Sequence, residues 1–169
     1  MNNVIITIGI SGSGKSTWST QFIKDNANYV RCNRDDIRRV LVGDLVSYYT
    51  RKDVNRLEDI VTGFQYEAIR DIIDSYNYNI IIDNTNLRKK YIQDVINEFE
   101  DYCTIQFKLF DCDLLEAKNR VAKRDNYPLS FDENHVYICP AVDYIDKQYQ
   151  QYQSIKKWIL EKYPNNIIT

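Results

Sequence analysis

A short loop near the start of the chain has the residue types and the spacing of a phosphate-binding loop. The pattern G-x-x-x-x-G-K-[ST] is matched without deviation by Gly9, Gly14, Lys15 and Ser16, directly after the apolar run 4–8. Its small residues let backbone amides curl around a polyphosphate, and a helix beginning near Lys15 adds its positive end. Lys15 can reach the β- and γ-phosphates of a nucleoside triphosphate, and the Ser16 hydroxyl can hold Mg²⁺. We therefore expect the loop to bind ATP, or another nucleoside triphosphate, through Gly12, Ser13, Gly14, Lys15, Ser16 and Thr17.

The loop alone does not separate a kinase from a GTPase or a motor ATPase. A GTPase would carry an Asn-Lys-x-Asp guanine reader, and the nearest stretch, Ala-Lys-Arg-Asp at 122–125, lacks the asparagine. A motor ATPase usually needs a larger domain than 169 residues. The small size therefore favours a kinase.

Asp35 and Arg38 are candidates for binding and activating a phosphate acceptor. Asp35 follows a predicted strand at 29–33, and open parallel sheets bind ligands at the carboxyl ends of their strands. Its carboxylate could accept the proton of an attacking hydroxyl. A helix would place Arg38 on the same face, which suits an acceptor with both a hydroxyl and a phosphate. The alternative is a helix start with an ordinary ion pair, since Asn33, Asp35 and Asp36 are all common there.

Asp83 ends another apolar run, 79–83, and the polar segment Asn-Thr-Asn follows at 84–86. A carboxylate after such a strand resembles a Walker B residue, which supports the Mg²⁺ shell. The alternative is a capped turn that leads into a helix near Leu87. We favour the functional interpretation, because a strand of this type in a P-loop fold normally ends beside the phosphates.

Arg120 and Arg124 are candidates for contacting the donor phosphates. They lie four residues apart at the end of a helix predicted at 114–124, just before the segment 125–130. Such a helix would place both guanidinium groups on one face, and a lid here could bring one onto the transferring phosphoryl group. The alternative is a solvated basic turn that offsets the helix dipole.

The elements that must position these residues alternate between strands and helices. Short apolar runs predict strands at 4–8, 29–33, 79–83 and 104–110. Apolar residues at spacings of three and four predict helices at about 15–25, 35–42, 53–76, 92–99, 114–124 and 145–159. The residues 44–52 show no clear period and are expected to form a loop. The alternation predicts an α/β fold of the P-loop kinase type, with a central parallel sheet of four to five strands and helices on both faces.

We expect the residues 1–169 to form one domain, because no repeat or linker interrupts the pattern. Within it we place a lid around 118–131 and a C-terminal helical region at 132–162. The tyrosines of that region, Tyr144, Tyr149 and Tyr152, are expected to pack rather than to stack on bases.

The composition excludes several classes of function. The formal net charge of −2 argues against a surface coated in positive charge, although a local basic groove could still bind a nucleic-acid end. The chain shows neither a signal peptide nor a membrane-spanning run. One histidine, and four cysteines without a C-x-x-C pair, argue against a zinc site and favour reduced thiols. We therefore expect a cytoplasmic protein that does not contact membranes, and the sequence identifies no protein partner.

Five segments taken together resemble the 5′-kinase domain of the phage T4-type polynucleotide kinases, which phosphorylate 5′-hydroxyl ends of DNA and RNA. They are TIGISGSGKSTW (7–18), NRDDIR (33–38), IVTGFQ (60–65), DNTNL (83–87) and RVAKR (120–124). The continuation of the P-loop into STW, with NRDD and DNTNL at matching distances, is more specific than the P-loop itself. The resemblance implies repair of nucleic-acid ends with ATP and Mg²⁺, in the host cytoplasm if a phage encodes the protein. On the donor side it implies that Lys15 and Ser16 bind the ATP phosphates and Mg²⁺, and that Arg124 reaches those phosphates from the lid.

The resemblance also implies roles on the acceptor side. Asp35 would be the general base that activates the 5′-hydroxyl of single-stranded DNA or RNA. Arg38 would hold the phosphate next to the acceptor sugar. Asp83 and Thr85 would support this end of the sheet.

The chain departs from that family in one respect. The T4-type enzyme has a second, 3′-phosphatase domain with an Asp-x-Asp-x-Thr core, whereas Asp-Cys-Asp-Leu-Leu at 111–115 lacks the threonine. Too few residues follow the predicted lid for that domain, so we expect kinase activity without phosphatase activity. Two alternatives remain open: a small-metabolite or nucleoside kinase on the same scaffold, and a non-catalytic nucleotide-binding module.

Overall fold

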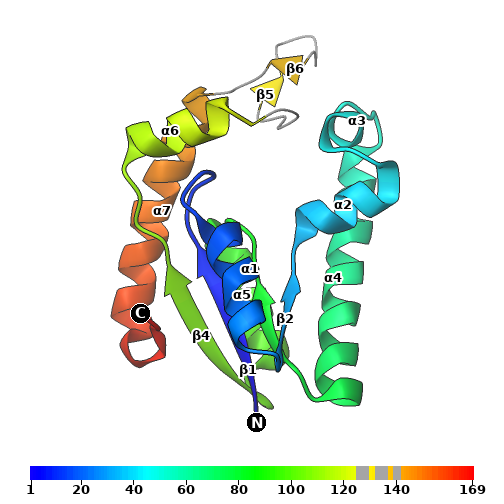
Figure 1. The fold of residues 1–169 in the computed structure, drawn as a ribbon, viewed down its shortest axis with the longest axis vertical. Helices are drawn as coiled ribbons and strands as arrows, with labels where there is room; N and C mark the ends of the chain where they lie inside the picture. The colour runs from blue at the N-terminus through cyan, green and yellow to red at the C-terminus, as the bar shows by residue number, and fades with distance from the viewer. Residues whose placement is uncertain (125–129, 132–136, 139–141) are drawn as a thin grey trace.

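The computed structural model describes residues 1–124, 130–131, 137–138 and 142–169, and a four-stranded parallel sheet forms its centre (Figure 1). The strands are β1 (Asn2–Ile8), β2 (Tyr29–Cys32), β3 (Asn79–Ile82) and β4 (Cys103–Leu109), and their order is β2-β3-β1-β4. All four predicted strands are therefore confirmed, within two residues at either end. Because the strands are parallel, the loops that follow β1, β2 and β3 emerge at the same edge of the sheet.

Helices cover both faces of this sheet. The helices of the described residues are α1 (Lys15–Asp25), α2 (Arg34–Val42), α3 (Leu45–Tyr49), α4 (Val54–Tyr76), α5 (Lys89–Phe99), α6 (Leu114–Ala122) and α7 (Val142–Lys162), followed by the 3₁₀ helix η1 (Pro164–Asn166). In Figure 1, α1 lies in front of the sheet and α5 behind it. The predicted α/β class, with helices on both faces, is therefore confirmed.

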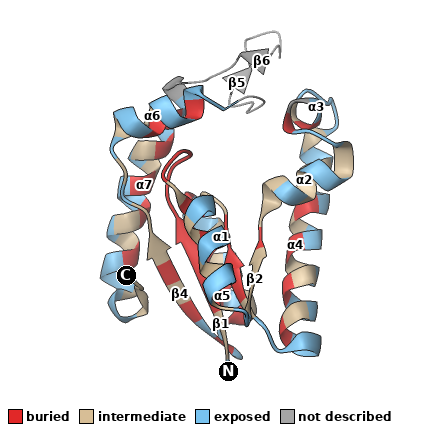
Figure 2. Cartoon of the chain, in the orientation of Figure 1, coloured by how far each residue is buried: buried red, intermediate tan, exposed pale blue. Residues whose placement is uncertain are grey.

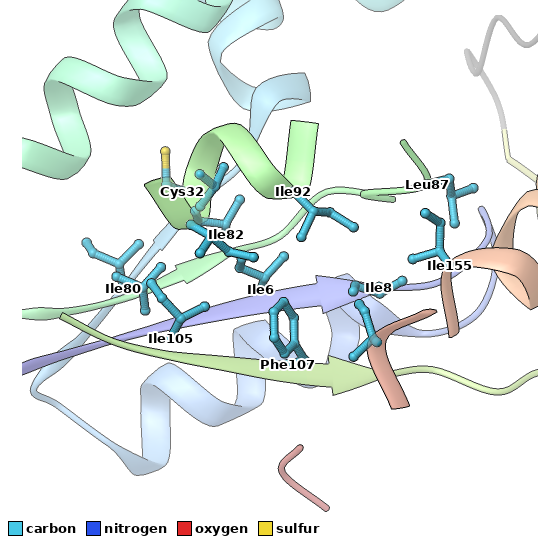
Figure 3. Packing of buried hydrophobic residues seen from close by; sticks show 14 of the residues in the cluster. Ile6, Ile8, Cys32, Ile80, Ile82, Leu87, Ile92, Ile105, Phe107 and Ile155 are labelled. Carbon is cyan, nitrogen blue, oxygen red and sulfur yellow. The ribbon is translucent and has the colours of Figure 1, made fainter. Parts of the chain in front are cut away.

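Isoleucine-rich strands supply the main core. Ile6, Ile8, Ile80 and Ile82 face one side of the sheet and pack with side chains of α4, α5 and α7 (Figure 3). Ile5 and Ile81 point to the opposite side, because successive side chains of a strand alternate, and they are buried as well. Burial on both faces explains why these strands are apolar without alternation. Figure 2 shows that burial extends from the strands into the loop after β1.

The loop predicted at 44–52 is wrong, because α3 occupies part of it. The Asp44 carboxylate accepts hydrogen bonds from the amide (2.7 Å) and the hydroxyl (2.7 Å) of Ser47, which caps a single helical turn. Leu45 and Tyr48 are one turn apart and both are buried. A helix of five residues is too short to give a periodic signal in the sequence.

Two predicted boundaries in the last third of the chain also need correction. The helix predicted at 114–124 ends at Ala122, so Arg124 lies beyond it. The region predicted at 132–162 is not helical throughout its described part, since Tyr137–Ile138 forms β6 and pairs antiparallel with β5 (Ser130–Phe131), whereas α7 spans Val142–Lys162. Aromatic and β-branched residues favour such strands. The central part of the predicted lid, 125–129, lies outside the described residues.

The tyrosines of α7 mostly pack, as expected. Tyr152 is buried and donates a hydrogen bond to Asp111 (2.9 Å), and Tyr149 packs against the core. Tyr144 differs, because it is exposed. Among the described helices, none has the length and apolar character needed to cross a membrane.

Candidate active site

A cleft of about 1690 Å³ lies at the carboxyl edge of the sheet, between the P-loop and the start of α2. Pockets for one drug-sized ligand usually occupy roughly 300–1,000 Å³. The cleft therefore has room for a nucleotide and a second substrate. In Figure 1, α2 and α6 stand on opposite sides of the P-loop.

The P-loop forms the donor end of the cleft. Gly12, Gly14, Lys15, Ser16 and Thr17 line it. Ser13 does not line it: its side chain is buried beneath the loop, and its hydroxyl accepts a hydrogen bond from Lys15 Nζ (3.3 Å). The loop and the first turn of α1 thus have the arrangement that the motif predicts.

Lys15 is a buried cation that forms no ion pair with any other described residue. Its Nζ donates to the carbonyl of Ile10 (2.7 Å). Burial lowers the pKa of Lys15 to about 8; the Asp83 carboxylate raises it, Arg124 lowers it, and Asp35 raises it. A cation held in this way gains most when an anion such as a phosphate arrives.

Gly12 allows the P-loop to pack closely on α6. Its φ is +84°, and a Cβ atom at this position would lie 2.6 Å from the carbonyl oxygen of Ala117. A left-handed conformation alone costs an L-residue about 1–2 kcal/mol. We expect Gly12→Ala to lower the free energy of unfolding by more than this, because the backbone of α6 must also move. The variant should also bind ATP more weakly.

Gly43 offers a matched control for this substitution. Its φ is +86°, but an added Cβ would meet nothing within 4 Å. Chemical denaturation of both alanine variants separates the conformational cost from the steric one. If both variants lost the same free energy of unfolding, the contact with α6 would not constrain the P-loop.

Asp83 lies beside the P-loop helix with one carboxylate oxygen unused. Its Oδ2 accepts hydrogen bonds from Ser19 Oγ (2.9 Å) and Arg31 Nε (2.7 Å), rather than from the amides of the following turn. Its Oδ1 is buried and has no hydrogen-bond partner in the described part of the chain. Thr85, which follows at the same edge, also lines the cleft.

These groups fit a hydrated Mg²⁺ ion. Mg²⁺ prefers oxygen ligands and keeps several of its waters. Ser16, exposed at the start of α1, and Asp83 would hold the ion, directly or through water, and the ion would offset charge on the phosphates. No group of three or more His, Cys, Asp or Glu side chains within the described ranges could hold a metal alone, so the phosphates would supply further ligands.

Two asparagines hold the start of α2 against the end of β3. Asn33 caps α2, since its Oδ1 accepts hydrogen bonds from the amide of Asp35 (2.8 Å) and from that of the next residue. Its Nδ2 donates to the carbonyl of Asp83. Asn84 Oδ1 accepts a hydrogen bond from the amide of Arg34 (3.0 Å). These bonds fix Asp35 at the same edge as Asp83.

Asp35 and Arg38 form the ion pair that the alternative interpretation describes, yet both side chains also line the cleft, as the acceptor-binding hypothesis requires. Arg38 Nη1 lies 2.7 Å from Asp35 Oδ1. The other side of Arg38 is held by Glu58 of α4, through Nε–Oε1 (2.7 Å) and Nη2–Oε2 (2.8 Å) contacts. Glu58 also accepts from Arg34 Nη2 (2.8 Å), so one carboxylate holds two guanidinium groups. The arrangement presents one carboxylate, Asp35, beside a positioned cation.

Glu58→Gln is expected to lower the free energy of unfolding by about 2 kcal/mol at neutral pH, since hydrogen bonds to charged groups contribute roughly 1.5–3 kcal/mol each. Burial opposes ionisation of Glu58, but the hydrogen bonds from Arg38 outweigh it and hold the pKa of Glu58 below its ordinary value. The carboxylate therefore stabilises the fold above about pH 4.5, and this contribution is lost as the pH falls through the lowered pKa.

Denaturation of the wild type and Glu58→Gln at pH 7 and pH 4 tests this expectation. The difference between them should shrink at pH 4. Asp59→Asn, at the exposed neighbouring position, serves as the control and should stay close to the wild type at both values. A difference that persists unchanged at pH 4 would contradict the charge-based explanation.

The two arginines of the predicted lid lie in different places. Arg124 lines the cleft and acts electrostatically on Lys15. Arg120 does not line it: its Nη1 donates to the carbonyl of Gly12 (3.0 Å), and its Nη2 pairs with Glu116. Because α6 ends at Ala122, the two side chains do not share a helical face. The structure therefore places Arg120 behind the P-loop, and its predicted contact with ATP stays a prediction.

Sequence reasoning missed Glu58 and Arg31. Arg31 lines the cleft and bridges Asp83 to Asp36. Both residues act through partners that are distant in sequence, such as Arg38 for Glu58 and Asp83 for Arg31. The one available signal for Arg31 was a charged residue within the otherwise apolar strand β2.

Comparisons with known proteins agree with this fold and loop. A family model described as an AAA domain matches residues 4–136. A chain in the solved structure of the Pnkp1/Rnl/Hen1 RNA repair complex is 30% identical, with a TM-score of 0.74 over 93% of this chain and 46% of that one. A chain in another structure of the Pnkp1/Rnl/Hen1 complex is 31% identical, with a TM-score of 0.61 over 75% of this chain and 40% of that one. This chain thus spans less than half the length of either.

A gluconokinase from Sinorhizobium meliloti 1021 is 14% identical, with a TM-score of 0.52 over 98% of this chain and 80% of that one. At this identity the likeness shows the fold alone, and it confirms the predicted P-loop kinase type. The match over residues 4–136 shows that the chain belongs to the AAA-domain family of P-loop proteins.

Proposed function

We propose that this chain is an ATP-dependent kinase that transfers the γ-phosphate to the 5′-hydroxyl end of DNA or RNA. One observation carries the proposal: Lys15 of the P-loop and the Asp35–Arg38 pair line the same cleft, and the Asp35 carboxylate acts on the pKa of Lys15. A donor phosphate and an acceptor hydroxyl can therefore meet between them.

Each side chain has a definite role in this reaction. The P-loop amides and Lys15 would bind the β- and γ-phosphates. The Asp35 carboxylate would accept the proton of the 5′-hydroxyl as its oxygen attacks the γ-phosphorus, and ADP would leave. Arg38 would bind the phosphate next to the acceptor sugar, and Glu58 would keep its guanidinium oriented. Arg124 would reach the donor phosphates from the opposite wall.

Two features favour a nucleic-acid acceptor over a small metabolite. The cleft is larger than one small ligand needs, and several arginine side chains line its acceptor side, including Arg34, Arg38 and Arg39. Guanidinium groups suit phosphates because they donate in a planar fork. Similarity to chains of an RNA repair complex supports the same class of acceptor.

Label transfer from γ-labelled ATP tests the proposal. The acceptors are 5′-hydroxyl DNA and RNA oligonucleotides of matched sequence, free nucleosides and gluconate, each with Mg²⁺. We expect label on the oligonucleotides. Label on nucleosides or gluconate alone would favour the metabolite kinase, and tight ATP binding without transfer to any acceptor would favour a nucleotide-binding module.

A further inference from the structure

Most cations that line the cleft already have partners. Arg31 pairs with Asp36 and Asp83, and Arg39 also pairs with Asp36. Arg34 and Arg38 pair with the carboxylate of Glu58, as described above. These guanidinium groups are therefore held by the protein itself before a substrate binds.

Arg88 and Lys90, at the start of α5, are different. Both line the cleft and both are exposed. Neither forms a hydrogen bond or an ion pair through its side chain with another residue of the described ranges. Asp94 lies one turn further along α5 and lines the same stretch, but it makes no ion pair with Lys90. Two positive charges thus face the cleft unneutralised.

Their position continues the acceptor side of the cleft. Tyr91, the residue after Lys90, lies against Arg34, whose guanidinium carbon is 5.3 Å from the centre of the ring. Arg34 in turn shares Glu58 with Arg38. A row of positive groups therefore runs from Arg38 through Arg34 to the start of α5. A groove of this kind follows the backbone of a single strand.

We propose that Arg88 and Lys90 bind backbone phosphates of the acceptor strand, beyond the nucleotide that Arg38 holds. This inference rests on the proposed function and adds to it a site for the strand rather than for its end. It implies that affinity grows with strand length. It also implies that the salt dependence of binding contains a contribution from these two residues, because each neutralised phosphate releases counterions.

The neighbour Lys89 supplies a matched control. Its Nζ lies 5.0 Å from the ring centre of Trp158 in α7, and it does not line the cleft. Lys89→Gln removes one positive charge from the same helical turn. It should therefore reduce the general electrostatic attraction of the oligonucleotide to the protein without removing either of the proposed phosphate-binding residues, Arg88 and Lys90.

Fluorescence anisotropy with labelled 5′-hydroxyl oligonucleotides of two and eight nucleotides, at several salt concentrations, tests the proposal. For Arg88→Gln/Lys90→Gln we expect about a tenfold loss of affinity for the eight-mer at low salt and a smaller loss for the two-mer. The plot of log K against log salt has a negative slope, and the magnitude of this slope should decrease by up to about 1.4 in the double variant, which is roughly 0.7 for each phosphate contact on a single strand. Lys89→Gln should stay within about twofold of the wild type.

The inference would be overturned by an eight-mer affinity that is unchanged in the double variant, by equal losses of affinity for both lengths, or by an equal loss of affinity in Lys89→Gln. A wild type that binds neither oligonucleotide would also overturn it. Because binding is measured without catalysis, a wild type that binds the eight-mer through these residues but transfers no label would leave this inference standing and reject the proposed function. A wild type that transfers label to the oligonucleotide, with no loss of affinity in the double variant, would support the proposed function and reject this inference.

Discussion

Asp35→Asn is expected to lower the turnover number of phosphate transfer by about 100-fold or more, because a positioned general base contributes roughly 10²–10⁴ in rate. The amide keeps the size of the side chain and an oxygen that can accept the hydrogen bond from Arg38, which is 2.7 Å long in the wild type. It cannot take a proton from the 5′-hydroxyl. ATP binding should stay within about threefold of the wild type, since Asp35 lies on the acceptor side. Steady-state transfer rates and ATP titrations measure the two effects separately.

Asp36→Asn is the control for this substitution. It makes the same chemical change one residue further along α2, at an exposed position that pairs with Arg31 and Arg39 and does not line the cleft. Exposed ion pairs contribute little, so its turnover should remain within about threefold of the wild type. Equal effects of the two variants would contradict a base role for Asp35, as would a loss of ATP binding in Asp35→Asn.

Lys15→Met is expected to abolish nucleotide binding and transfer while making the nucleotide-free protein more stable. Burial lowers the pKa of Lys15 from 10.5 to about 8, which corresponds to roughly 3 kcal/mol of destabilisation at neutral pH. Methionine has a similar shape and no charge. The carbonyl of Ile10 also accepts a hydrogen bond from the amide of Ser13 (3.2 Å), so it still has a hydrogen-bond donor after the substitution. We expect a net gain of about 1–3 kcal/mol after the lost Nζ hydrogen bond is allowed for.

The stability that Lys15→Met gains over the wild type should decrease as the pH rises. Between pH 8 and 10.5 the folded Lys15 binds its proton less tightly than the unfolded one, so the stability of the wild type rises with pH over this window. The penalty is complete below pH 8, and the advantage of Lys15→Met should shrink as the pH rises above it. Chemical denaturation at pH 7 and pH 9.5 measures this change.

Lys24→Met, near the exposed end of α1, is the matched control and should show neither the gain nor its pH dependence. ATP with Mg²⁺ should raise the midpoint of thermal unfolding of the wild type and of Lys24→Met, but not that of Lys15→Met. A destabilised Lys15→Met, or one that ATP still stabilises, would contradict the role assigned to this lysine.

The sequence predicted the strands and the longer helices well, because each has its own local pattern. The isoleucine runs define the strands, and the apolar stripe of α4 defines a helix without reference to other elements. The pattern failed where structure depends on a few residues: α3 is a single turn capped by Asp44, and α6 ends two residues before Arg124. The strand order β2-β3-β1-β4 depends on packing between distant segments, and the local pattern carries no information about it.

The site was predicted in part for the same reason. The P-loop is a contiguous motif, and Asp35 and Arg38 are one helical turn apart, so spacing alone could join them. Glu58 reaches Arg38 across the interface of α2 and α4, and Asn33, at the end of β2, reaches the carbonyl of Asp83 at the end of the neighbouring strand β3. Such partners become visible only when the chain is folded. They determine whether the base and the cation are held in place.

The structure of a ternary complex tests the central claim most directly. The wild type would be crystallised with Mg²⁺, a non-hydrolysable ATP analogue and a short 5′-hydroxyl oligonucleotide. We expect the 5′-oxygen at roughly 2.6–3.2 Å from an Asp35 carboxylate oxygen. We also expect it in line with the terminal phosphorus at about 3–3.5 Å. A 5′-end bound elsewhere, or an Asp35 carboxylate turned away from that oxygen, would contradict the account.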